Sequence, residues 1–227
     1  MRAVLWDMDG TLVDSEKLWD VGIQELYRRH GRELSVAVRT ATIGGSSDVV
    51  MRIVYADLGL EPDPADLAAT ADWLHDYVGE LFAAGLPWCD GAREMLDAMA
   101  ETGLPMALVT NTRRGLAEKA LDSIGRRYFT VTVCGDEVPA GKPSPDPYLR
   151  AAALLNLDPA DCLAIEDSVT GTASAESAGC AVLVVPNEIE VPSGPRRRQI
   201  PSLSGLTVGH LHALHAELGT ELDERSA

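Results

Sequence analysis

The chain has 227 residues, of which 46% are hydrophobic and 24% charged, a composition that excludes disordered and fibrous proteins. Its 19 Lys and Arg residues against 35 Asp and Glu residues give a net charge of −16. Nucleic-acid binding depends on Lys and Arg that displace counterions from phosphates, so we expect no nucleic-acid partner. If the chain binds an anion, the binding site must supply its own cations.

The cysteines and the apolar segments indicate the cellular compartment. The first apolar run ends at Asp7 and is too short for a secretion signal, and no later run is long enough to span a membrane. No Cys-x-x-Cys pair occurs, so we expect buried thiols rather than disulfides or a zinc site. We therefore predict a cytoplasmic protein that does not bind membranes and is a monomer or a weak homo-oligomer.

Short apolar runs predict buried strands at residues 3–6, 106–109, 131–134, 163–165 and 181–185. Continuous apolarity, rather than alternation, is typical of parallel strands covered by helices on both faces. Helical segments at 115–124, 147–155 and 170–178 separate most of these strands. We predict an α/β fold with a Rossmann-like, doubly wound parallel sheet.

The first two predicted strands are separated by about a hundred residues, far more than a strand-to-helix connection needs. Within this stretch, residues 18–30, 48–58 and 66–82 have the apolar spacing of helices. We predict an inserted, all-α-helical cap at residues 15–88, and a core formed by 1–14 and 89–227. Residues 186–201 are expected to form a loop and 208–218 a last helix.

Two carboxylates, Asp7 and Asp9, directly follow the first predicted strand. Open parallel sheets bind ligands at the carboxyl ends of their strands. Two neighbouring carboxylates at such an end are costly unless a cation neutralises them, and Mg²⁺ prefers oxygen ligands of this kind. Alone, the Asp-x-Asp pattern is equally compatible with a solvated turn.

The segment from Asp7 to residue 16 resembles the first motif of the haloacid dehalogenase superfamily. The resemblance is to its helical-cap branch, which contains sugar-phosphate phosphatases and β-phosphoglucomutase. The other motifs follow in the family's order, at residues 108–111, 141–143 and 165–168. Four motifs in one order at four strand ends make a chance match improbable.

The resemblance implies a role for each matching residue. Asp7 would be the nucleophile that forms an aspartyl-phosphate, and Asp9 the general acid and base. Lys142, an ordinary surface lysine by itself, would balance the charge of the phosphate and Asp7. The remaining roles are phosphate binding by Thr110 and Asn111, and Mg²⁺ binding by Asp7, Asp9 (through its backbone carbonyl), Asp167 and Glu166. Thr110 is also a candidate N-cap of the following helix.

Several activities are compatible with this superfamily, and single residues distinguish them. A dehalogenase would leave Asp9 and Asp167 without a role, and a phospho-receiver-like switch would not need the helical insert. Mutases of this branch carry an arginine and a histidine where this chain has Ser47 and Trp19.

The cap loop that contains Gly45 and Ser46 is neutral and suits a hydroxyl-rich, singly phosphorylated ligand. Trp19 lies at the entry to the cap and is expected to face the substrate. We therefore predict a Mg²⁺-dependent phosphatase that hydrolyses a small phosphomonoester, a sugar phosphate in the first instance, through an aspartyl-phosphate. The alternative is a β-phosphoglucomutase-like phosphosugar mutase.

Overall fold

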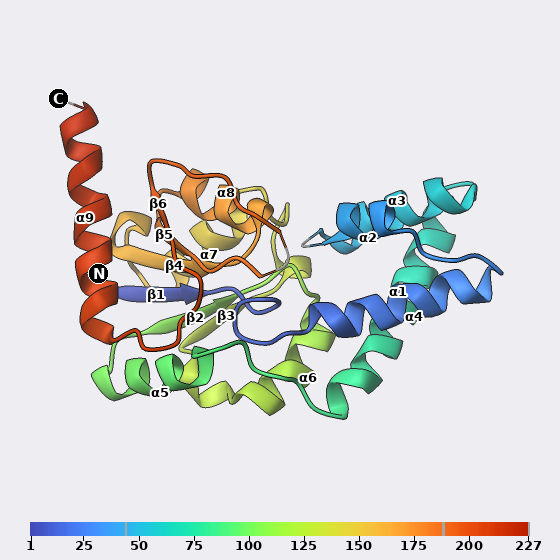
Figure 1. Ribbon diagram of the computed structural model, residues 1–227, viewed down its shortest axis with the longest axis horizontal. Helices are drawn as coiled ribbons and strands as arrows, with labels where there is room; N and C mark the ends of the chain where they lie inside the picture. Colours follow the sequence, from blue (N-terminus) through green and yellow to red (C-terminus); the bar gives the residue numbers. More distant parts are fainter. Residues whose placement is uncertain (44, 188, 227) are drawn as a thin grey trace.

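The computed structural model describes residues 1–43, 45–187 and 189–226. Over these residues the core is a six-stranded, fully parallel sheet in the order β3-β2-β1-β4-β5-β6 (Figure 1). The predicted doubly wound α/β fold is confirmed. The strands are β1 (Ala3–Trp6), β2 (Met106–Val109), β3 (Val131–Val133), β4 (Cys162–Glu166), β5 (Ala181–Val184) and β6 (Arg197–Gln199).

Alternate residues of the strands enter two different hydrophobic cores, one on each face of the sheet. Val4 and Trp6 pack with helices α5 (Ala92–Thr102), α6 (Arg114–Ile124) and α9 (Val208–Ser226). Ala3 and Leu5 pack on the opposite face, with α7 (Asp146–Leu154) and α8 (Val169–Ala178). Burial on both faces explains why β1 and β2 are apolar at every position.

Four helices form the insert, which lies beyond the carboxyl ends of the strands (Figure 1). They are α1 (Glu16–Arg29), α2 (Val36–Thr42), α3 (Ser47–Leu58) and α4 (Pro64–Ala83). Two connecting segments join the insert to the core and pair antiparallel at Val13 and Trp88. The N–H of Asp14 donates to the carbonyl of Pro87 (2.9 Å), and the N–H of Cys89 donates to that of Leu12 (3.0 Å). The insert thus enters and leaves through one short ladder; the exact domain boundaries stay a prediction.

One strand and two helices differ from the expectation. Residues 186–201 were expected to be a loop, but they contain β6, which pairs with β5 at the edge of the sheet. An edge strand has one partner and a solvated side, so it does not need the apolar run by which buried strands are found. The helices α2 and α5 were also missed.

Short 3₁₀ turns at Arg126–Tyr128, Gly135–Glu137 and Pro159–Asp161 complete the described structure. The cysteines are free thiols, as predicted: Cys134, Cys162 and Cys180 are buried and Cys89 is half-buried. Among the described residues, no helix has the length and apolarity that crossing a membrane requires.

Candidate active site

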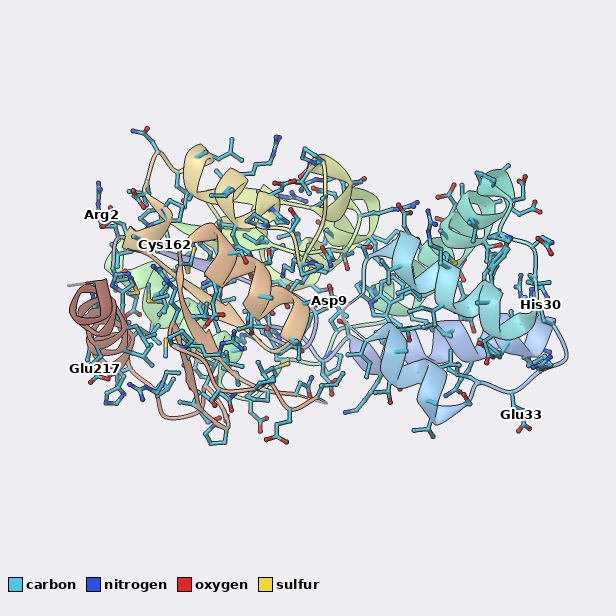
Figure 2. All side chains as sticks on the ribbon, turned by 90° about the horizontal axis from the view of Figure 1, so that it is seen from above. Arg2, Asp9, His30, Glu33, Cys162 and Glu217 are labelled. Carbon is cyan, nitrogen blue, oxygen red and sulfur yellow. The ribbon has the colours of Figure 1, made fainter. Side chains whose placement is uncertain are left out.

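A cleft lies between the carboxyl edge of the sheet and the helical insert. Asp7 and Asp9 follow β1, Thr110 and Asn111 follow β2, and Asp167 follows β4, so three neighbouring strands deliver polar groups to it. Figure 2 shows Asp9 where the core meets the insert. Ligand sites of enzymes with parallel sheets commonly have this position.

Lys142 joins two carboxylates on the floor of the cleft. Its Nζ lies 2.5 Å from Oδ1 of Asp7 and 2.6 Å from Oε1 of Glu166. The side chains are 3%, 8% and 0% exposed, respectively. Because a buried charge is stable only when it is paired, this ammonium and the two carboxylates depend on one another.

The charges of this group alter its proton affinities. Burial is the main cause that raises the pKa of Asp7, and the nearby Glu166 raises it further, whereas Lys142 opposes both. Burial lowers the pKa of Lys142, but the two carboxylates outweigh it and the net shift is upward. Lys142 is therefore held as an ammonium. At Asp7, burial and Glu166 together favour the protonated form more than Lys142 favours the charged form.

Glu166 is fully engaged by protein donors. Its Oε1 accepts from Lys142 and from the hydroxyl of Tyr148 (2.7 Å), and its Oε2 accepts from the N–H of Asp167 (3.2 Å) and the hydroxyl of Ser168 (3.1 Å). A Cβ on Gly171 would overlap this carboxylate. These contacts hold the Glu166 carboxylate beside Lys142.

Asp167 completes a carboxylate cluster that suits a hard cation. One oxygen from each of Asp7, Glu166 and Asp167 lies within 4.8 Å of the others, and all three residues are buried. When all three carboxylates are ionised, they and the ammonium of Lys142 leave a net charge of −2. A divalent cation balances that charge, and the donors are the oxygens that Mg²⁺ prefers. Gly10 (φ +82°) allows the approach, because a Cβ there would overlap Oδ2 of Asp167.

Asp9 is held by three hydroxyl groups. Its Oδ1 accepts from Ser15 (2.6 Å), and its Oδ2 accepts from Thr110 (3.1 Å) and Thr112 (2.8 Å). The N–H of Thr112 in turn donates to the hydroxyl of Thr110 (3.0 Å). The loop after β2 therefore positions the Asp9 carboxylate at the cleft.

Asn111 holds the backbone of Lys142 from both sides. Its Oδ1 accepts from the N–H of Lys142 (2.8 Å), and its Nδ2 donates to the carbonyl of the same residue (3.3 Å).

The suggested N-cap role of Thr110 is wrong, because α6 begins at Arg114 and has Arg113 as its N-cap residue. The N–H of Arg114 donates to Asp136 (2.8 Å), a carboxylate from a distant part of the chain that propensity alone does not reveal.

The insert forms the other wall of the cleft. Gly45 and Ser47 line it, whereas Ser46 lies beside Gly141 at the junction with the core. Trp19 lines the cleft too, as expected from its position in the sequence.

Four residues of the site were missed in the sequence. Thr112 carries a weak signal, since it stands two residues after Thr110 and its side chain faces the same carboxylate. Tyr148, Ser15 and His75 belong to residue types that are common in cores and on helix faces. Only their position in the folded chain brings Tyr148 to Glu166 and His75 to the cleft.

Comparisons with known proteins show the family to which the chain belongs. A family model described as haloacid dehalogenase-like hydrolase matches residues 1–179. The chain is 33% identical to a phosphoglycolate phosphatase of Thiobacillus denitrificans, covering 82% of this chain and 83% of the relative. It is 32% identical to hexitol phosphatase A of Escherichia coli, covering 84% and 86%.

Among solved structures, a β-phosphoglucomutase of Clostridium difficile has the same fold, with a TM-score of 0.84 and 17% identity, over 96% of this chain and 98% of that one. The motifs in the sequence, the order of the strands and the family model agree over most of the molecule. The chain belongs to the haloacid dehalogenase-like hydrolase family.

Proposed function

We propose that this chain is a Mg²⁺-dependent phosphatase that hydrolyses a small phosphomonoester, and that its substrate is a sugar phosphate. The reaction would proceed through an aspartyl-phosphate on Asp7. The observation that carries the proposal is the buried Asp7–Lys142–Glu166 group beside Asp167 at the floor of the cleft. The family match and the two relatives named as phosphatases support the same class of reaction.

In the first half of the reaction, an oxygen of Asp7 attacks the phosphorus and the bond to the ester oxygen breaks. Asp9 donates a proton to the departing alkoxide, which leaves as an alcohol. In the second half, Asp9 takes a proton from water, the water oxygen attacks the phosphorus, and the bond to Asp7 breaks. Lys142 offsets the negative charge that the phosphate brings to Asp7.

The residues present fit Mg²⁺, which would be held by Asp7, Asp167 and the backbone carbonyl of Asp9. When bound, the ion would neutralise charge on the phosphoryl oxygens and on Asp7. Glu166 contributes through Lys142, because both of its oxygens already accept hydrogen bonds from the protein. Thr110 and Asn111 would act on the phosphate by ordering the loops around it.

The test is release of inorganic phosphate from a panel of sugar, nucleotide and short-acid phosphates, with Mg²⁺ and with EDTA. We expect release that requires Mg²⁺ and disappears in Asp7→Asn, a substitution that keeps size and shape. Circular dichroism and the thermal midpoint would verify that this variant is folded. An active Asp7→Asn protein, or full activity in EDTA, would contradict the proposal.

Two further measurements address the intermediate and the alternative. Acid-quenched protein that has turned over radiolabelled substrate should carry label that mild base removes, as an acyl phosphate does. A coupled assay for conversion of β-glucose 1-phosphate to glucose 6-phosphate would reveal a mutase. Efficient conversion with little phosphate released would establish the mutase instead.

The cytoplasm remains the predicted compartment, and a monomer or weak homo-oligomer the predicted state. The predicted partner is a small phosphorylated metabolite. Sedimentation of the purified chain would test the state of assembly.

A further inference from the structure

The wall that the insert contributes to the cleft is mostly apolar. Ile23, Val50, Met51 and Leu74 reach the cleft from three different helices and are themselves almost fully buried. A leaving group that fills the cleft would therefore contact hydrocarbon over much of its surface. Such a wall favours an uncharged leaving group, because burying a charge against it has no compensation.

A polar pair, Ser47 and His75, interrupts this apolar wall. Oγ of Ser47 lies 3.1 Å from Nε2 of His75, and Nδ1 of His75 lies 2.7 Å from the carbonyl of Ala71. A carbonyl only accepts, so Nδ1 carries the proton and Nε2 of the neutral ring is an acceptor. Burial lowers the pKa of His75, which favours this neutral ring. The Ser47 hydroxyl then donates to the ring, and its oxygen keeps lone pairs that can accept from a ligand.

Trp19 fixes this pair in place. Its ring meets that of His75 edge to face, with centroids 5.4 Å apart and an angle of 85° between the planes. This contact restricts rotation of the imidazole, so the acceptor atoms of the pair are held at the cleft.

The positive charges around the wall already have carboxylate partners. Arg39, which lines the cleft from α2, pairs with Asp20 of α1. At the boundary with the core, Arg113 pairs with Asp72 (2.8 Å) and lies 3.9 Å from Asp48. A carboxylate or a second phosphate on the leaving group would have to compete with these acids for the same cations.

We propose that this cleft selects phosphomonoesters with uncharged, hydroxyl-bearing leaving groups, and that Ser47 with His75 accepts the hydrogen bond from the hydroxyl. This inference rests on the proposed phosphatase function and narrows its substrate class. It separates polyol and sugar monophosphates, which fit, from carboxylate-bearing esters and bisphosphates, which do not.

Two esters with the same three-carbon skeleton give a direct test. Glycerol 3-phosphate ends in a hydroxymethyl group, and 3-phosphoglycerate ends in a carboxylate. We expect kcat/KM with Mg²⁺ to be at least about tenfold higher for glycerol 3-phosphate, which corresponds to about 1.4 kcal/mol. An equal or higher value for 3-phosphoglycerate would overturn the inference.

A variant of the polar pair tests the assignment of residues. Ser47→Ala should lower kcat/KM about fivefold more for glycerol 3-phosphate than for p-nitrophenyl phosphate, whose leaving group has no other hydroxyl. Ser47→Thr keeps the hydroxyl and should restore most of the difference. If Ser47→Ala lowers kcat/KM equally for both esters and leaves the thermal midpoint unchanged, Ser47 does not bind the hydroxyl of the leaving group.

A second variant tests the charge argument by a gain of activity. Asp20→Asn removes the partner of Arg39, so 3-phosphoglycerate should improve about fivefold relative to glycerol 3-phosphate. The matched control is Asp76→Asn, which changes an exposed carboxylate of α4 outside the lining of the cleft. If Asp20→Asn leaves the ratio at the value of the control, the ion pair does not exclude anions and this part of the inference is wrong.

The results also separate this inference from the function on which it rests. If no ester, including p-nitrophenyl phosphate, releases phosphate with Mg²⁺, the phosphatase itself is refuted. If p-nitrophenyl phosphate and 3-phosphoglycerate are hydrolysed and glycerol 3-phosphate is not, the phosphatase stands and the substrate class is wrong.

Discussion

Replacing Lys142 by Met tests how strongly the folded chain depends on one buried ammonium. The substitution keeps the length of the side chain but leaves Asp7 and Glu166 without their shared partner. Removing one member of a buried ion pair typically costs about 3–5 kcal/mol. For a chain of this size each kcal/mol lowers the thermal midpoint by about 2–4 °C, so we expect a fall of about 10 °C.

The measurement is urea and thermal unfolding followed by circular dichroism, in EDTA so that no cation replaces the lost charge. Lys17→Met is the control, because this lysine also pairs with a carboxylate, Asp14, but is 73% exposed and should contribute less than about 1 kcal/mol. Adding Glu166→Gln to Lys142→Met removes one of the unbalanced charges and should recover part of the loss. A midpoint equal to that of the control, or a further fall in the double variant, would refute the charge argument.

Two further substitutions examine the loops around the site. Gly10→Ala should lose about 2 kcal/mol of stability and bind Mg²⁺ more weakly by calorimetry, because its Cβ would overlap Asp167. Gly31→Ala has a similar positive φ in open space, so it controls for backbone strain, and equal Mg²⁺ binding by both variants would contradict the reasoning. Thr112→Val removes one of the hydroxyl donors to Asp9 and should lower kcat about fivefold with little change in KM. An unchanged kcat would show that the other donors suffice.

The buried strands could be predicted from the sequence because both faces of the sheet are covered. Every position of β1 and β2 is buried, so each strand appears as an unbroken apolar run. The edge strand β6 escapes this rule, since Arg197, Arg198 and Gln199 are partly or fully exposed. The helix α2 escapes it because it is short and has one buried residue, Thr42.

The candidate site was predictable where a motif follows a strand, because the parallel sheet gathers such positions at one edge. Asp7 and Asp167 are brought together in this way, and Lys142 reaches them from the loop that precedes α7. Tyr148 and His75 were not predictable. Tyr148 donates to Glu166, which is distant in the sequence, and His75 meets Ser47 only because α3 and α4 pack together. Such contacts cannot be inferred from residue type and spacing in the sequence.

The ladder between Val13 and Trp88 has a consequence for how this protein can evolve. Because the insert leaves and rejoins the core at one point, its helices can change in length or sequence, or be replaced, while the strand order of the sheet stays the same. The groups proposed to act on phosphorus belong to the core, whereas Ser47 and His75 belong to the insert. Mutations in the insert can therefore change the substrate that is bound, while selection preserves the catalytic residues of the core.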